Sequence, residues 1–411
     1  MDSALNPYTP NAGASPEIVV GREEQTRAFR TLLRRLGAGR THQSMVMVGL
    51  RGVGKTVLLN EFREIAHAKR WEVIELEASK HDDTRFRQTI ATLMRAALLR
   101  LSPRARWSER SRKAAEVITA FSMSVDQQGT WSLAWDVDAA EGLADHGELA
   151  LDLSDALVAL GEAAREKDRG VAILIDEVQF LNAPQLEALI QAIHKTVQRR
   201  LPVTFVGAGL PQIAELAGDA KSYAERLFQF PKIDSLETAD ARRAIADPAA
   251  AEGVEYEEDA IDLAVEITRG YPYFIQELGY QVWEIAEQSP ISRQDVEDAR
   301  EAYEAKLDSS FFRVRLDRAT PLQTAYMRAM AELGPEPQKA DAVARLMGRE
   351  STQVGPTRAE LIDMGLLYTP DHGYAAFTVP DFDKFMLRAV PELQVPEIRK
   401  RRRKQRGGDG G

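Results

Sequence analysis

Up to about residue 235 the chain alternates short, unbroken apolar runs with segments in which apolar side chains recur at helical spacing. Unbroken runs of this length are typical of strands buried on both faces of a parallel sheet. Such strands alternating with helices predict a doubly wound α/β sheet. The predicted strands are 44–48, 71–76, 171–175, 203–206 and 228–233, and the predicted helices include 21–36, 57–70, 86–101, 151–160 and 186–197.

Beyond residue 235 the apolar spacing is helical almost to the end of the chain. One group of helices is predicted at 239–246, 258–268, 273–287 and 293–307. A second group, at 322–333, 340–347 and 352–364, precedes a β-hairpin that turns at 371–373, and these are the parts of a winged helix-turn-helix. The predicted order is an extended segment (1–18), an α/β core (19–235), a helical domain (236–318), a winged helix (319–396) and a disordered tail (397–411).

Residues 102–147 interrupt the α/β pattern of the core. The stretches 121–125 and 131–135 flank a Gln-Gly pair and are compatible with a β-hairpin. They are equally compatible with an irregular insertion, and the sequence leaves both alternatives open.

Composition excludes several kinds of chemistry. The 411-residue chain has no cysteine, which rules out disulfides, thiolate metal sites and cysteine nucleophiles and suits a cytoplasmic protein. The six histidines show no metal-ligand spacing. No apolar run is long enough to span a membrane, and the N-terminus lacks the regions of a signal peptide, so no membrane partner is expected.

Charge is distributed unevenly. The net charge is −10, from 53 basic and 63 acidic side chains. Seven of the basic residues lie between Arg399 and Arg406, so the rest of the chain carries 46 minus 63, or −17. We therefore expect an acidic body and a basic tail, in which Arg401, Arg402 and Arg403 are central.

A phosphate-binding motif follows the first predicted strand. It fits G-x-x-x-x-G-K-[ST] without substitution and consists of Gly49, Leu50, Arg51, Gly52, Val53, Gly54, Lys55 and Thr56. Glycines let backbone N–H groups approach phosphate oxygens, and the next helix points its positive end at them. Lys55 is expected to reach the β- and γ-phosphates of ATP, and the Thr56 hydroxyl to ligate Mg²⁺.

A pair of carboxylates, Asp176 and Glu177, ends the apolar run at 171–175. Asp176 at the carboxyl end of a strand is expected to hold the Mg²⁺ shell, as a Walker B aspartate does. Glu177 is expected to orient or deprotonate the attacking water. Alone this pattern is weak, but together with the phosphate motif it predicts an ATPase.

The two motifs and the domain order resemble the AAA+ ATPases, in particular the initiator-like group of origin-recognition ATPases and the related STAND-type signalling ATPases. The resemblance runs from about Val19 to Arg388. It implies an AAA+ core, a helical lid and a winged helix in that order. It also implies that Gly21 and Arg22 wrap the adenine and that Pro272 contacts the base or ribose end of the nucleotide.

The resemblance further implies an arginine finger at Arg226, before the fifth strand, which reaches the γ-phosphate of a neighbouring subunit. Self-association is therefore expected. Two departures point to slow hydrolysis and a nucleotide switch. Gly207–Gly209 stands where many members carry a polar sensor, which leaves Thr204 or backbone for that role, and Tyr273 stands where a sensor arginine is expected.

Two functions of the winged helix and the tail are compatible with this architecture. In the first, the ATPase assembles on DNA, with base contacts from Gln353, Thr357 and Arg358 and phosphate contacts from the tail. In the second, the winged helix docks a protein partner of a signalling ATPase. Residues 320–395 hold seven basic and ten acidic side chains, which favours at most a small DNA footprint.

Overall fold

A computed structural model describes residues 1–11, 13–80, 82–123 and 137–397. The chain divides into two compact units, Met1–Tyr303 and Glu304–Gly411. Within the described residues no helix is long and apolar enough to cross a membrane.

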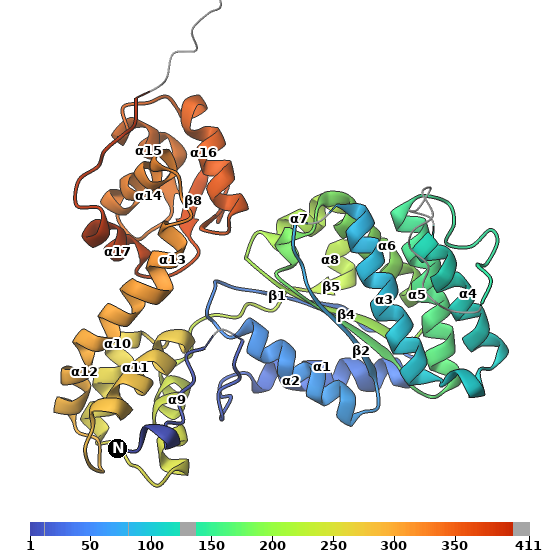
Figure 1. Ribbon diagram of the computed structural model, residues 1–411, viewed down its shortest axis with the longest axis horizontal. Coiled ribbons are helices and arrows are strands. Elements are labelled where there is room, and N and C mark those ends of the chain that lie inside the picture. Colours follow the sequence, from blue (N-terminus) through green and yellow to red (C-terminus); the bar gives the residue numbers. More distant parts are fainter. Residues whose placement is uncertain (12, 81, 124–136, 398–411) are drawn as a thin grey trace, which may run out of the picture. The chain divides into compact units, whose positions relative to one another are not determined.

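The first unit is built on a five-stranded parallel sheet, which confirms the α/β class (Figure 1). The strand order is β2-β3-β4-β1-β5. The strands are β1 (Ser44–Val48), β2 (Glu72–Glu77), β3 (Val171–Asp176), β4 (Val203–Gly209) and β5 (Phe228–Gln229). Because β1 and β3 both pair with β4, the segments that follow β1 and β3 emerge on either side of the end of β4.

Helices cover both faces of this sheet, with α1 and α2 on one face in Figure 1 and α3, α5 and α6 on the other. Strand residues such as Val46, Ile74 and Ile173 share a buried cluster with the second group, and alternate residues point the other way. On the first face Phe29 of α1 stacks on Phe62 of α2. The helices between the start of the chain and the end of this sheet are α1 (Glu23–Gly37), α2 (Lys55–Ala68), α3 (Asp83–Leu101), α4 (Glu109–Met123), α5 (Leu149–Glu166), α6 (Ala183–Gln198), α7 (Ile213–Ala220) and α8 (Ala224–Leu227).

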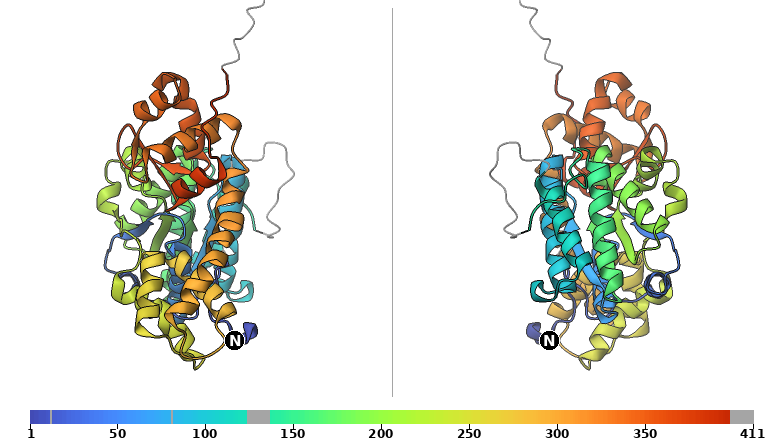
Figure 2. Two further views of the ribbon diagram at one scale, coloured as in Figure 1. Left: turned by 90° about the vertical axis from the view of Figure 1, so that its left-hand side faces the viewer. Right: turned by 90° about the vertical axis from the view of Figure 1, so that its right-hand side faces the viewer.

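The predicted insertion contains the helix α4, which runs beside α3 and α5 in the side views (Figure 2). Its buried residues Ala114, Ile118 and Phe121 recur at helical spacing, so residues 121–123 end a helix and do not form the first strand of the hairpin alternative. The rest of that hairpin lies outside the described residues.

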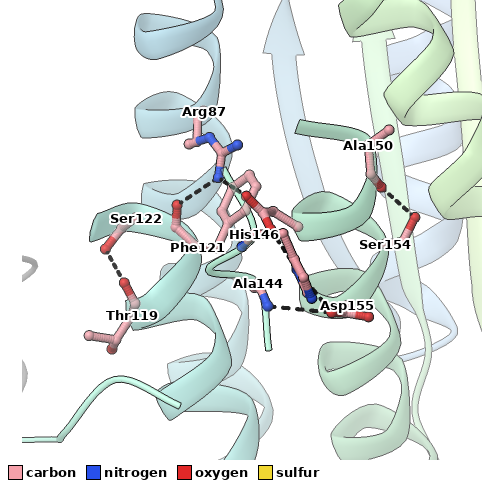
Figure 3. A network of polar contacts seen from close by, with 10 residues as sticks. Arg87, Thr119, Phe121, Ser122, Ala144, His146, Ala150, Ser154 and Asp155 are labelled. Carbon is pink, nitrogen blue, oxygen red and sulfur yellow. Dashed lines mark hydrogen bonds and ion pairs between the residues drawn. The ribbon is translucent and has the colours of Figure 1, made fainter. Parts of the chain in front are cut away.

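A buried ion pair holds these three helices together (Figure 3). Arg87 of α3 donates to the fully buried carboxylate of Asp152 of α5 at 2.8 Å and to the carbonyl of Phe121 at 3.3 Å. The other carboxylate oxygen of Asp152 accepts from the backbone N–H of His146 at 2.9 Å and lies 3.0 Å from its Nδ1. The hydrogen bond to Asp152 raises the pKa of His146. Three partners therefore compensate the desolvation of this carboxylate.

Four helices follow the sheet in the region of the predicted lid: α9 (Thr238–Ala251), α10 (Glu258–Thr268), α11 (Pro272–Ile285) and α12 (Arg293–Lys306). The N-terminal segment packs against them. Tyr8 is buried and its hydroxyl donates to the carbonyl of Ile245, while the indole N–H of Trp283 donates to the carbonyl of Asp2 at 2.9 Å. The predicted extended segment is thus anchored to the lid.

The second unit contains α14 (Pro321–Leu333), α15 (Ala340–Leu346), α16 (Ser351–Asp363) and α17 (Phe382–Ala389). Its small antiparallel sheet has the order β6-β8-β7, with β6 (Gln338–Lys339), β7 (Leu367–Tyr368) and β8 (Tyr374–Phe377). Leu307–Phe312, a π-helical turn, and α13 (Arg313–Leu316) belong to this unit rather than to the predicted lid, because Phe312 stacks on Phe385. The sequence patterns did not predict α7, α13 or α17.

Candidate active site

The two predicted motifs meet at the carboxyl edge of the sheet. The phosphate motif follows β1 and becomes the first turn of α2, and Asp176 is the last residue of β3. The strand β4 lies between them, in register with Val48 opposite Gly209 and Ile175 opposite Gly207. Ligands of open α/β sheets bind at this edge, where loops from neighbouring strands converge.

Glycines give the phosphate loop its shape. Gly52 and Gly54 have φ of +83° and +92°, a region that side chains disfavour, and Gly54 directly precedes α2. A Cβ on Gly49 would collide with the carbonyl of Ile233. The backbone N–H groups at the start of α2 are free of intrahelical partners and suit an anion such as a phosphate.

The Lys55 ammonium lies inside this loop. It donates to the carbonyls of Gly49 and Leu50 at 3.0 and 2.7 Å and is only 7% exposed. Burial lowers the pKa of Lys55 to about 8, against the opposing effect of the carboxylates of Glu177 and Asp176. The group is therefore charged below about pH 8, and above that pH an approaching anion would favour its protonation.

Thr56 and Asp176, the two expected Mg²⁺ ligands, lie next to each other. The hydroxyl of Thr56 donates to the carboxylate of Asp176 at 2.6 Å. Hydroxyl and carboxylate oxygens are the ligands that Mg²⁺ accepts, so the pair fits this ion. No group of three or more His, Cys, Asp or Glu side chains in the described part of the chain could hold a metal unaided, so phosphates and water would complete such a site.

Glu177 has two partners that the sequence motifs did not predict. Its backbone is left-handed, with φ of +52°, and one carboxylate oxygen lies 3.7 Å from the guanidinium of Arg51. The other oxygen accepts from the side-chain amide of Gln179, whose own oxygen accepts from the backbone N–H of Leu210 at 3.0 Å. The spacing Asp-Glu-x-Gln was the only signal for this contact in the sequence.

The suggestion that Thr204 supplies the missing sensor is wrong. Thr204 is buried at the start of β4, where its hydroxyl lies 3.1 Å from that of Ser44, at the amino edge of the sheet. A side chain that does reach the carboxyl end of β4 is that of Gln179, whose amide oxygen accepts from the backbone N–H of Leu210.

Arg22 and the turn before α11 close on the phosphate loop from two sides. Arg22 donates to the carbonyls of Val53 and Asp234 at 3.0 and 2.6 Å, and burial lowers its pKa. Next to Pro272, the hydroxyl of Tyr271 donates to the carbonyl of Arg51, and the N–H of Tyr273 donates to that of Gly52 at 3.2 Å. Gly21 precedes Arg22 with φ of +69°. The lid is thus hydrogen-bonded to the loop backbone.

Arg226 lies at the opposite edge of the sheet. It is exposed, and its carbonyl accepts from Gln43, the residue before β1. Because β1 has five residues, the two edges are roughly 15 Å apart along this strand. Arg226 therefore cannot serve the site of its own subunit in this conformation.

The DNA-contact candidates of the second unit differ in exposure. Gln353 is exposed, although its side chain caps α16 by accepting from the N–H of Glu350 at 3.0 Å. Arg358 is half-buried and donates to the carbonyl of Tyr374 at 2.6 Å. Thr357 is 5% exposed, so the prediction that it contacts DNA is not supported. Arg401, Arg402 and Arg403 lie outside the described residues.

Comparisons with known proteins give a family match in each of the two units. Residues 18–206 match the AAA ATPase domain family, and residues 309–386 match a domain of unknown function (DUF8462). No curated protein matches the chain. The Walker-type ATPase PABY2304 of Pyrococcus abyssi is 14% identical over 90% of this chain and 97% of its own, with a TM-score of 0.56, which shows a shared fold.

Two further solved structures are similar to a lower degree. The Aeropyrum pernix Orc1 protein in complex with DNA is 16% identical over 92% of this chain and 94% of its own, with a TM-score of 0.44. Cdc6p from Pyrobaculum aerophilum is 14% identical over 96% of this chain and 99% of its own, with a TM-score of 0.45. Both similarities are too low to support an inference.

The sheet, the glycine loop and the carboxylate pair define the first unit as a P-loop ATPase. The family match is more specific: the protein carries an AAA+ ATPase domain and binds and hydrolyses ATP.

Proposed function

We propose that the protein is a slow, Mg²⁺-dependent ATPase whose nucleotide state regulates its assembly on DNA. The observation that carries the catalytic part is the run of contacts from the phosphate loop to the carboxylates. Lys55 lies in the loop, Thr56 donates to Asp176, and Glu177 follows directly with its carboxylate beside Arg51. These are the groups that phosphoryl transfer to water requires.

In this proposal each residue has a separate role. Lys55 binds the β- and γ-phosphate oxygens, and Thr56 and Asp176 would hold Mg²⁺, which would neutralise charge on those phosphates. Glu177 orients water and accepts its proton as the water oxygen bonds to the γ-phosphorus. The bond from that phosphorus to the bridging oxygen breaks, and the bridging oxygen leaves on ADP.

The Glu177→Gln variant tests the catalytic role. An amide cannot accept the proton of water, so we expect ATP binding to persist and turnover to fall by about 10²-fold or more. Calorimetry measures the binding and phosphate release measures the turnover. The variant Glu215→Gln, at an exposed position on α7, is the control. Turnover that stays within a few-fold of the parent in Glu177→Gln contradicts the assignment.

The second unit and the tail supply the proposed DNA contacts. The helices α14, α15 and α16 are followed by an antiparallel hairpin, and α16, with Gln353 exposed, would be the recognition helix. The seven basic residues between Arg399 and Arg406 suit phosphates, and phosphate contacts carry no information about base sequence. Affinity would then depend mainly on the tail, and sequence preference on α16.

A protein-docking role of the second unit is the second candidate. It is favoured by the acidic balance of residues 320–395, by the burial of Thr357 and by the engagement of Arg358 with Tyr374. A regulatory switch of the STAND type would use the same ATPase cycle with this output.

Deletion of the residues after Glu397 separates the two outputs. If the tail binds duplex DNA, its seven basic residues release at most about seven counterions, a slope of roughly −6 in log K against log salt. The truncated protein should show a flatter slope and weaker binding to every sequence, with any sequence preference retained. Fluorescence anisotropy with two unrelated duplexes at several salt concentrations measures this. Unchanged affinity and slope exclude the tail, and no binding by either protein favours protein docking.

A further inference from the structure

Both carboxylate oxygens of Glu177 have protein partners. The side-chain amide of Gln179 donates to one oxygen, and Gln179 is itself fixed by the N–H of Leu210 at the end of β4. The second oxygen faces the guanidinium of Arg51 at 3.7 Å, beyond the length of a good hydrogen bond. The two contacts therefore differ: the amide contact fixes the carboxylate, and the arginine contact is a loose ion pair that costs little to exchange.

The backbone of Arg51 is fixed by a hydrogen bond, whereas its side chain keeps a hydrogen-bond donor without a partner among the described residues. Its carbonyl accepts from the hydroxyl of Tyr271, which belongs to the turn before the lid helix α11. Its Nε is buried and has no hydrogen-bond partner among the described residues, and about a quarter of the side chain is exposed. A guanidinium in this condition has unused donors for a second anion.

We propose that Arg51 acts in cis as a γ-phosphate sensor that exchanges Glu177 for the γ-phosphate. The inference rests on the proposed ATPase site and goes beyond it. With ADP, Arg51 stays paired with Glu177 and the carboxylate is held by two partners. With ATP, Arg51 turns to the γ-phosphate, and Glu177 keeps only Gln179 and is free to accept from water. Gln179 is a positioning residue in both states.

Charge and reach support the exchange. Arg51 is part of the phosphate loop, two residues after Gly49, so its side chain starts at the loop that surrounds the phosphates. A γ-phosphate carries more negative charge than a carboxylate and offers three oxygens to a forked donor. Because Tyr271 ties the Arg51 backbone to the lid, the lid and the sensor move together.

A double-mutant cycle between Arg51 and Glu177 tests the proposal. The four proteins are the parent, Arg51→Met, Glu177→Gln and the double variant. The ligands are ADP and the β,γ-imido analogue of ATP, which is not hydrolysed, both with Mg²⁺. Arg51→Met should weaken the analogue about tenfold and leave ADP unchanged, since only the γ-phosphate contact is lost. Glu177→Gln should tighten the analogue about threefold, because Arg51 is released from its carboxylate.

The double variant decides between a sensor and a structural arginine. A sensor requires that the gain from Glu177→Gln disappears when Arg51 is already methionine. Arg51→Lys should recover part of the affinity for the analogue, because the charge is kept without the fork. Equal weakening of ADP and analogue by Arg51→Met, or additive effects in the cycle, overturns the proposal.

The same measurements distinguish a failure of the underlying site. If the parent binds the analogue but Lys55→Ala binds it equally well, the proposed ATP site itself is wrong. If Lys55→Ala loses the analogue while Arg51→Met keeps the parental ratio of analogue to ADP affinity, the site stands and only the sensor is refuted.

Discussion

ATP affinity is expected to fall below detection in Lys55→Ala. The ammonium is the buried cation of the phosphate loop, where it lies 3.0 and 2.7 Å from the carbonyls of Gly49 and Leu50. A charge-assisted contact in a buried site is stronger than one in water, and alanine also removes one of the positive charges that face the phosphates and the neighbouring carboxylates. Calorimetry on both proteins measures the loss. Lys69→Ala, an exposed lysine just beyond α2, is the matched control.

The same lysine makes ATP binding depend on pH. Burial lowers the pKa of Lys55 to about 8, so below this pH the group is charged and its contribution to affinity is constant. Above it, binding must first return a proton to the lysine, so affinity falls as pH rises. Titrations near pH 9 in two buffers of different ionisation enthalpy should detect proton uptake. Lys55→Ala with an undisturbed ATP affinity, or binding near pH 9 without proton uptake, contradicts the placement of this group.

Sequence patterns predicted those structural features that depend on residues adjacent in the chain. The β1 strand, the glycine loop and Lys55 are contiguous in the chain. Their geometry therefore depends on local conformation, and the sequence motif was enough to predict it. The apolar run before Asp176 likewise identified a central strand of a parallel sheet. The meeting of Thr56 with Asp176 then follows from parallel strands that end at one edge.

The missed contacts depend on side-chain directions that local pattern does not fix. Glu177 sits in a left-handed turn, which aims its carboxylate at Arg51 and Gln179 rather than along the strand. Thr204 is a candidate sensor in the sequence because Gly207–Gly209 offers no polar side chain, but β4 extends to Gly209 and leaves Thr204 at the amino edge of the sheet. The inward direction of Thr357 depends on how α16 packs in its unit, which spacing alone did not reveal.

Hydrolysis is expected to require a neighbouring subunit, with Arg226 as the group supplied in trans. Arg226 is exposed at the amino edge of the sheet, whereas Lys55 and Glu177 lie at the carboxyl edge, so a second subunit has to bring its arginine to the site. Specific activity should therefore rise with protein concentration. Arg226→Ala should abolish the rise and lower turnover about 10³-fold without weakening ATP binding, because an arginine finger stabilises charge in the transition state. Arg226→Lys should not restore turnover, since an ammonium lacks the planar fork.

Mixing two inactive variants gives the sharpest test of the trans arrangement. Arg226→Ala keeps an intact ATP site and lacks the finger, while Lys55→Ala keeps the finger and lacks the ATP site. In a mixed assembly an Arg226→Ala site can receive the arginine of a Lys55→Ala neighbour, so the mixture should regain turnover that neither variant has alone. Regained turnover cannot arise from a residue that acts within one chain. A mixture that stays inactive, together with a parental rate per subunit that is flat over a wide dilution series, means that each subunit hydrolyses ATP alone and that Arg226 is a surface residue.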